Sequence, residues 1–255
     1  MKNILHIICL VCFVGLFSSC LQEINSTYDP GPTPAVVRIH GDSAKMMANT
    51  RYGWLYDDKF SSYSDGKCLL IRFSYNPSEN GNKDAQKRGY YEVNLTNDMK
   101  VTQKDAVAEQ VDINVLLPKE QTIVYAVNPN DKEYYHVIEN FLFLPSVCHT
   151  TRLQPIEWQL MYDPNQQPIV ENGKSIYALF LRAVAQTDPL ENAQPELVPE
   201  INAFNLASFL MDVRAHGGRE GDISIQIHYI DRINPQDSTR FAWNATEPLL
   251  LKTTK

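Results

Sequence analysis

Apolar and polar residues alternate with a period of two along most of the chain after residue 35, and this alternation predicts β-strands. The strand segments are separated by turns that contain Gly, Pro, Asn or Asp, as at Asp65-Gly66. The clearest strand is DISIQIHYIDRI, near the C-terminus. Four sets of residues are each predicted to share one strand face: Leu69, Ile71 and Phe73; Tyr91, Val93 and Leu95; Ile156, Trp158, Leu160 and Tyr162; Ile223, Ile225, Ile227 and Tyr229.

Strand length divides the chain into two modules. Residues 35–115 hold four or five short strands and a polar loop, SENGNKDAQKR, which is typical of a small barrel. We expect this module to close with a short helix or an edge strand in VTQKDAVAEQV. Residues 116–255 hold longer strands and predict a β-sandwich without helices. The segment INAFNLASFLMDVRAHG is compatible with a helix, but Pro195, Pro199 and recurrent β-forming residues favour strand. The predicted fold class is all-β.

Three aromatic residues of the first module, Tyr52, Trp54 and Tyr56, fall on one face of a strand. Exposed, they would offer a platform for a sugar or a protein partner. Buried, they would form the core of the module. The pattern favours the core, and exposure of Trp54 stays open.

The N-terminus has the order of a secretory signal. Lys2 supplies a positive charge, Ile4 to Phe17 an apolar stretch, and two small serines precede Cys20. The apolar stretch is shorter than the roughly 20 residues of a spanning helix. We predict a lipoprotein signal in residues 1–19 with lipid attachment at Cys20. Phe17 stands where Leu or Val is usual, so an ordinary signal peptide is the alternative.

The residues after Cys20 predict an extended tether over 20–34. This segment is polar and carries Pro30, Pro32 and Pro34. Glu23 is the only acidic residue directly after the cysteine, which weakens the case for display on the cell surface. The predicted location is the bacterial outer membrane, with the periplasmic or surface face left open.

The net charge restricts the classes of partner that the chain is expected to bind. The whole chain has 23 basic and 30 acidic residues, a net charge of −7, and losing Lys2 with the signal leaves the mature chain at −8. A negative protein is a poor ligand for the phosphates of nucleic acid or for anionic lipid. The membrane is therefore predicted to be reached through the lipid on Cys20, and nucleic acid is excluded as a partner.

Two cysteines of the mature chain remain beside Cys20. Cys68 and Cys148 lie 80 positions apart, each in an apolar stretch. Export would allow them to form a disulfide, whereas apolar surroundings are typical of buried free thiols. We expect two separate buried thiols, because the stretches fall in different modules.

No pattern of a catalytic, metal or cofactor site occurs in the sequence. Asp212, Arg214, His216 and Arg219 surround a Gly-rich turn, where they would bind an anion or simply form a solvated hairpin end. His228 lies opposite the isoleucines of its strand, so we expect it to face solvent. Acidic residues are plentiful, but no pair stands out as that of a glycoside hydrolase.

The order of these segments resembles the NigD-like family of envelope lipoproteins. The resemblance rests on RYGWLYDDKF, KCLLIRFSYNP and GYYEVNLTNDMKV in the first module and on GREGDISIQIHYID in the second. It implies an N-terminal OB-type barrel followed by a β-sandwich, and it implies no catalytic residues. OB-type barrels often bind oligosaccharides or single-stranded nucleic acid, and the acidic charge and the predicted export speak against nucleic acid here.

These observations predict a lipid-anchored envelope protein with a non-enzymatic binding role. An envelope protein or a glycan is the expected partner, through residues that the sequence does not identify. The alternatives are a structural or assembly lipoprotein, such as a fimbrial or operon-encoded component, and then a glycan hydrolase.

Overall fold

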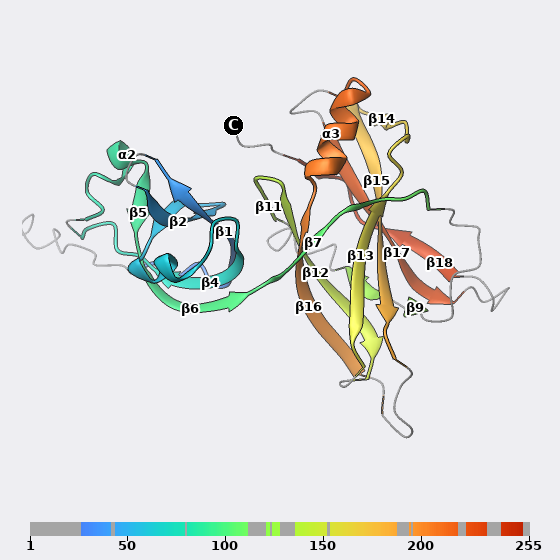
Figure 1. Ribbon diagram of the computed structural model, residues 1–255, viewed down its shortest axis with the longest axis horizontal. Coiled ribbons are helices and arrows are strands. Elements are labelled where there is room, and N and C mark those ends of the chain that lie inside the picture. The colour runs from blue at the N-terminus through green and yellow to red at the C-terminus, as the bar shows by residue number, and fades with distance from the viewer. Residues whose placement is uncertain are drawn as a thin grey trace, which may run out of the picture.

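Two β-domains lie side by side in the computed structural model (Figure 1). The structure describes residues 27–41, 44–79, 81–111, 121–122, 124–127, 136–151, 154–187, 194, 196–218, 223–233 and 241–251. The predicted signal in residues 1–19 and the predicted lipid site at Cys20 lie outside these ranges. The predicted fold class, an OB-like barrel followed by a β-sandwich, is confirmed.

The first domain is a barrel built from one sheet with the strand order β5-β3-β2-β1-β4-β6. β3 and β5 are parallel, whereas β4 and β6 are antiparallel. Only Val93 separates β5 from β6, and its amide donates to the carbonyl of Tyr56 at 3.0 Å. One continuous stretch therefore pairs with both ends of the sheet and closes it. The elements are β1 Thr33–His40, β2 Lys45–Thr50, β3 Gly53–Tyr56, η1 Asp58–Ser62, β4 Cys68–Ser74, α2 Ala85–Arg88, β5 Tyr90–Glu92 and β6 Asn94–Lys100.

The barrel interior contains the faces that the alternation predicts. Leu69, Ile71 and Phe73 of β4 are buried there with Leu95 of β6. Tyr91 and Val93 pack against this core and are partly buried. The 3-10 helix η1 adds Phe60, which is fully buried.

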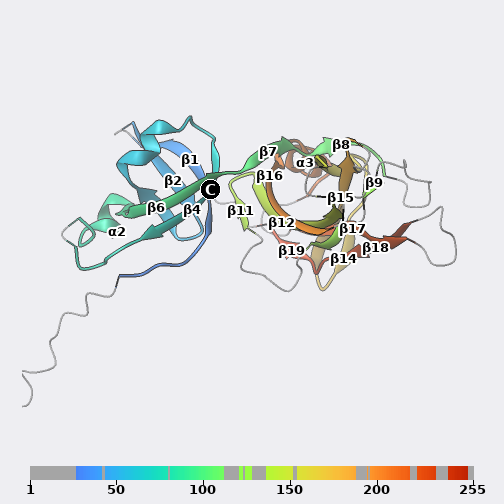
Figure 2. The same cartoon turned by 90° about the horizontal axis from the view of Figure 1, so that it is seen from below.

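The second domain is a sandwich of two sheets whose facing sides form one hydrophobic core (Figure 2). The first sheet has the order β10-β12-β16-β7, and β11 also pairs with β12. The second has the order β18-β17-β15-β13-β8, with β9, β14 and β19 paired to its strands. The strands are β7 Thr102–Asp105, β8 Val107–Ala108, β9 Gln121–Thr122, β10 Val124–Val127, β11 His136–Ile138, β12 Phe141–Thr150, β13 Ile156–Tyr162, β14 Ile169–Glu171, β15 Lys174–Ala185, β16 Glu196–Asn205, β17 Ile223–Ile233, β18 Phe241–Ala245 and β19 Leu249–Leu250.

The predicted faces of β13 and β17 both point into the sandwich core. The prediction of a sandwich without helices is wrong at one place, because α3 spans Ala207–Ala215 at one end of the sandwich. Phe209, Leu210 and Val213 are its buried residues. The prolines that argued against a helix lie before it, in β16 and its approach, so they do not interrupt it.

The boundary between the domains lies earlier than the predicted 115/116. β7 pairs with β16 and β8 pairs with β13, so both belong to the sandwich. Neither is the closing helix or edge of the barrel. Val101 alone separates β6 from β7. The sequence does not reveal this assignment for two reasons. Thr102–Asp105 has few apolar residues, and its partner strand β16 follows about a hundred residues later.

The predicted tether over 20–34 overlaps the barrel. Tyr28 forms a backbone bridge with Tyr75, and the two amides donate to the opposite carbonyls at 2.9 and 3.0 Å. β1 then begins at Thr33. Residues 28–34 therefore belong to the barrel, and only the earlier part of the predicted tether lies outside the described residues.

Candidate ligand-binding face of the barrel

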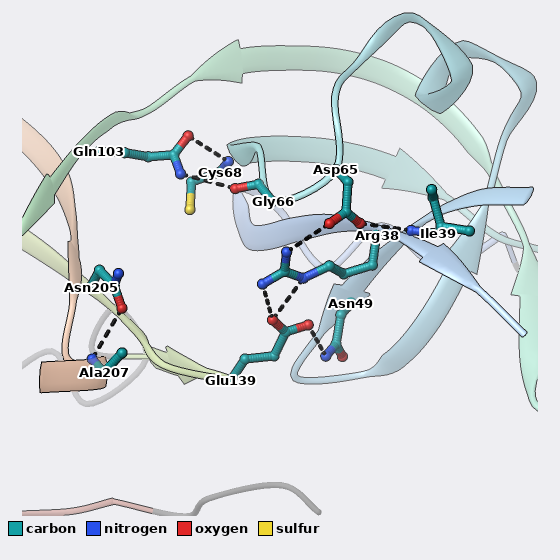
Figure 3. A network of polar contacts seen from close by, with 10 residues as sticks. All are labelled: Arg38, Ile39, Asn49, Asp65, Gly66, Cys68, Gln103, Glu139, Asn205 and Ala207. Carbon is teal, nitrogen blue, oxygen red and sulfur yellow. Dashed lines mark hydrogen bonds and ion pairs between the residues drawn. The ribbon is translucent and has the colours of Figure 1, made fainter. Parts of the chain in front are cut away.

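A polar clamp fixes the two domains against each other at the outer side of β1 and β2 (Figure 3). The guanidinium of Arg38 donates to Glu139 Oε2 from Nε at 2.9 Å and from Nη2 at 2.6 Å. It also donates to Asp65 at 3.1 Å. Asn49 Nδ2 donates to the other oxygen of Glu139 at 3.2 Å. These contacts raise the pKa of Arg38, mainly through the hydrogen bond to Glu139.

The conformation of Glu139 is unusual for its residue type. It occupies the tight β11–β12 turn with a φ of 57°, in the left-handed region. That region costs a non-glycine residue about 1 kcal/mol or more. The side chain of Glu139 accepts the bonds from Arg38 and Asn49, so the ion pair offsets a strained backbone.

An apolar contact and a second polar contact continue the interface. Val36, Cys68 and Val101 pack with Ile138 and Phe143 of the sandwich. Gln103 of β7 donates to the carbonyl of Gly66 at 2.9 Å and accepts from the amide of Cys68 at 3.2 Å. The interface therefore covers the outer side of β1 and leaves that of β3 and β5 accessible.

Aromatic rings gather on this uncovered outer side. In register, Trp54 of β3 lies beside Tyr90 of β5, and Tyr56 follows two positions along. Tyr56 and Tyr90 meet edge to face with ring centroids 5.9 Å apart. The ring of Trp54 stacks against His40, a residue of β1, at 4.3 Å. We call His40, Trp54, Tyr56 and Tyr90 the aromatic face.

The His40–Trp54 stack reaches from β1 to β3 and so passes over the strand between them. The outward residue of β2 at this level is Met47, which pairs with Arg38. Met47 is fully buried although it points away from the barrel interior.

Charged groups border the aromatic face. Lys45 Nζ lies 4.4 Å above the ring of Tyr56, and the guanidinium of Arg88 lies 4.6 Å from that of Tyr90. Arg88 also pairs with Glu92 at 2.6 Å. The hydroxyl of Tyr56 donates to Asp58, and this bond raises the pKa of Tyr56. The face thus combines flat apolar surfaces with cationic and carboxylate groups at its rim.

The prediction that Tyr52, Trp54 and Tyr56 are core is wrong for the last two. Leu55, between them, is 2% exposed and occupies the interior. Trp54 and Tyr56 are half-buried on the outer side. Tyr52 packs partly against the barrel core. Alternation separates the two faces of a strand but does not say which face is inside, and here a single leucine marks the interior.

A cavity lies between the two domains, and its lining differs from the aromatic face. It has a volume of about 610 Å³ and is lined mainly by aliphatic residues and prolines, including Leu70, Met99, Pro145 and Pro199. Lys100 and Glu200 are its charged residues. None of its lining residues is aromatic. It lacks the ring surfaces that stack on sugars, so the aromatic face is the better candidate for a polar ligand.

Among the other predicted residues, those that the structure describes make contacts within the sandwich. Asp212 accepts a hydrogen bond from the buried Tyr162 hydroxyl at 2.8 Å. His216 contacts the carbonyl of Asp212 at 2.8 Å, and Arg219 lies outside the described residues. Asp212 therefore ties α3 to the sandwich. His228 is half-buried against Phe180 rather than free in solvent, and burial lowers its pKa.

The two described cysteines are separate thiols, as expected. Cys68 lies in the interface between the domains and Cys148 in the sandwich core. Burial raises the pKa of Cys68 to about 12 and that of Cys148 to about 11. Both thiols are therefore protonated and poorly reactive at neutral pH.

Among the described residues, no three His, Cys, Asp or Glu side chains are grouped so that they could hold a metal ion. None of the helices in the described part of the chain has the length and hydrophobicity needed to span a bilayer.

The barrel is similar to a known family. Residues 25–99 match the family model described as the lipoprotein OB domain. The match covers the barrel and not the sandwich. The OB domain ends just before the structural boundary at Val101, which agrees with the strand pairing. No match was found among curated proteins.

Solved structures from Parabacteroides merdae and Bacteroides fragilis share the fold over both domains. An uncharacterised protein from Parabacteroides merdae has a TM-score of 0.69 at 16% identity, over 88% of this chain and 100% of that chain. A candidate lipoprotein from Bacteroides fragilis has a TM-score of 0.59 at 11% identity, over 90% and 100%. A NigD-like immunity protein from Bacteroides caccae has a TM-score of 0.47 at 10% identity, over 88% and 98%.

The resemblance to the NigD-like envelope lipoproteins is confirmed. It rests on the lipoprotein OB domain and on the shared arrangement of barrel and sandwich. Identities of 16% and below carry the fold and not an activity. The function must therefore be argued from the site.

Proposed function

We propose that this chain is a lipid-anchored envelope protein whose OB domain binds a glycan on the aromatic face. The lipid is attached at Cys20 and holds the protein at the outer membrane. Binding is non-enzymatic and uses rings that the folded barrel already presents. The match to the lipoprotein OB domain supports the association with the cell envelope.

The accessible rings of Trp54, Tyr56 and Tyr90 carry this proposal. Sugars have C–H faces that pack on aromatic rings and hydroxyls that need hydrogen-bonding partners at the edge. The face supplies both, because Lys45, Arg88 and the carboxylates of Asp58 and Glu92 border the rings. Its rings lie on β1, β3 and β5, and Lys45 of β2 stands at its border. OB barrels commonly bind oligosaccharides or oligonucleotides on the face of their second and third strands, which supports a ligand here.

Charge favours a glycan over nucleic acid. Nucleobases also stack on aromatic rings, but affinity for nucleic acid depends on cations that neutralise phosphates. The chain has a net charge of −7. Within the face, Arg88 is already paired with Glu92. Uncharged or weakly acidic sugars avoid the cost of bringing a polyanion to a negative protein.

The test is a binding screen of the mature chain, with Cys20→Ser to prevent lipidation, against neutral and acidic envelope glycans. A hit is then titrated by calorimetry. Trp54→Ala and Tyr56→Ala are each expected to weaken binding about tenfold, because each removes one stacking surface. Met211→Ala is the matched control, since Met211 is 64% exposed on α3, away from the barrel. Binding that is unaffected by both ring variants, or no binding at all, contradicts the proposal.

Lipidation is tested separately in cells. The wild-type chain is expected to incorporate a labelled fatty acid and to fractionate with outer membranes. Cys20→Ala is expected to abolish both, whereas Ser19→Ala should retain them. A labelled Cys20→Ala protein would show that another residue carries the lipid.

A further inference from the structure

The end of the barrel where residues 28–34 join it holds a small cavity that the aromatic face does not use. Its volume is about 170 Å³. Leu55 and Phe73 form its floor and are each 2% exposed. Four tyrosines form its walls: Tyr28, Tyr52, Tyr75 and Tyr91.

The walls are arranged as a box. Tyr28 meets Tyr52 and Tyr75 at interplanar angles of 80° and 82°, each with centroids 6.3 Å apart. Tyr75 meets Tyr91 at 67° and 5.5 Å, and Tyr52 meets Phe73 at 71° and 6.2 Å. Neighbouring walls thus stand close to perpendicular around a hollow. Close packing of the same rings in a core would leave no such space.

The size of the cavity suits one compact group. A cavity of about 150 Å³ holds a benzene-sized molecule. The wall tyrosines are only partly buried, with Tyr28 48% exposed, so the cavity opens to solvent. A ligand can therefore enter without unfolding the barrel.

The chemistry of the walls selects a cation. Aromatic faces carry negative electrostatic potential, and several faces around one space attract a cation whose hydration is weak. The guanidinium of Arg51 lies 4.7 Å from the ring centroid of Tyr52 and also donates to its hydroxyl. Among the described residues, no Lys or Arg side chain lines the cavity. The net charge of −7 further favours a positive ligand.

We propose that this tyrosine box binds a quaternary ammonium group of the choline type. The methyl groups contact the four tyrosine faces, and Leu55 and Phe73 contact the end of the group. The described lining residues include no carboxylate, so recognition by them rests on cation–π attraction rather than on an ion pair. The site is separate from the aromatic face and does not depend on glycan binding.

The first test compares choline with 3,3-dimethyl-1-butanol, a neutral molecule of the same shape. The mature chain with Cys20→Ser is titrated with each while the aromatic proton resonances are followed by NMR. Choline is expected to bind at least tenfold more tightly, because only the charged compound gains from the ring faces. Equal affinity would mean that the box is merely an apolar cavity and would overturn the proposal.

Variants of Tyr28, the most exposed of the four wall tyrosines, test whether choline binds in the box. Tyr28→Leu is expected to weaken choline binding about tenfold or more, and Tyr28→Phe should restore it, since the ring and not the hydroxyl makes the contact. Tyr28 contributes little to the buried core, so both variants should fold, which circular dichroism checks. Trp54→Ala should leave choline binding unchanged. Loss of choline binding in Trp54→Ala but not in Tyr28→Leu would place the cation on the aromatic face and overturn the assignment.

The ligand group occurs both free and on lipid headgroups, and two further titrations separate the sources. Free phosphocholine and phosphatidylcholine vesicles are compared with phosphatidylglycerol vesicles. Binding of phosphocholine alone supports a soluble ligand, and additional Tyr28-dependent binding to phosphatidylcholine supports a headgroup. If choline, phosphocholine and vesicles all fail, the box has no such ligand, whereas the glycan screen still stands on its own result.

Discussion

The two domains use the same aromatic residue types in opposite ways. Trp158 of the sandwich is 1% exposed, and its indole nitrogen donates to Glu200 on the facing sheet at 2.9 Å. Trp54 of the barrel is half-buried on the outer side and stacks on His40. Tyr162 and Tyr56 repeat the contrast, one in the core and one on the surface. The sandwich therefore buries Trp158 and Tyr162 in its core, whereas the barrel holds Trp54 and Tyr56 on its outer side.

The largest expected effect comes from the two tryptophans. Trp158→Ala should lower the free energy of unfolding by about 3–5 kcal/mol, because it empties a packed core and leaves Glu200 without its donor. Trp54→Ala should cost less than about 1 kcal/mol. Urea denaturation followed by circular dichroism measures both. Equal losses would show that Trp54 is a core residue after all.

The clamp between the domains ranks next. Arg38→Ala and Glu139→Gln should each weaken the docking of the domains by about 1–3 kcal/mol. Hydrogen exchange should then speed up in β1 and at the start of β12, with less change inside either core. Glu139→Gly is the sharper variant. It relieves the φ of 57° but removes the ion pair, and we expect a net loss.

If Glu139→Gly increased the free energy of unfolding, the backbone strain at residue 139 would be larger than the stabilisation from the contact with Arg38. The comparison of the domains would then need revision, because attachment of the barrel would depend on the apolar contact and on the Gln103 hydrogen bonds. Lys87→Ala is a suitable control, since Lys87 forms only an exposed pair with Asp84 within the barrel.

Removing the hydroxyl group of one tyrosine in each domain tests the same contrast between core and surface, with smaller expected changes in stability. Tyr162→Phe removes the bond to Asp212 and should cost about 1 kcal/mol. Tyr56→Phe removes an exposed bond to Asp58 and should change stability by less than about 0.5 kcal/mol. The difference in urea midpoint between these variants is the measurement. A larger loss for Tyr56→Phe would contradict the assignment of the outer face.

The smallest effect concerns pH. Burial lowers the pKa of His228 below its ordinary 6.5, so the folded protein binds this proton more weakly than the unfolded chain does. The stability associated with neutral His228 is therefore present above about pH 6.5 and is lost as the pH falls through the lower folded pKa. His228→Gln should show a smaller fall in urea midpoint between pH 7.5 and 5 than the wild type.

Much of the fold follows from local pattern. Residues 69, 71 and 73 and residues 223, 225, 227 and 229 point inward because strands alternate, and a buried face must be apolar. The closed barrel could not be read from pattern alone, since closure depends on which strands pair. The shared role of β5 and β6 appears only once Val93 is seen to continue one strand into the next.

The sites depend on longer-range facts than alternation supplies. The aromatic face was missed because the sequence does not say that Leu55, and not Trp54, fills the interior. The tyrosine box joins Tyr28 to Tyr75 and Tyr91, which lie on separate segments. Glu139 had no signal at all, since its partner Arg38 is 101 residues away. The apolar residues that α3 buries are evident in the sequence, but the prolines before them favour a strand.

Val101 gives the molecule a mechanical property. This single residue joins the domains, is 2% exposed, and its amide donates to the carbonyl of Cys68 at 3.2 Å. A link of one buried, hydrogen-bonded residue leaves little freedom for the barrel to rotate against the sandwich. A force applied to the barrel is therefore transmitted to the sandwich through Val101 and the contacts around it.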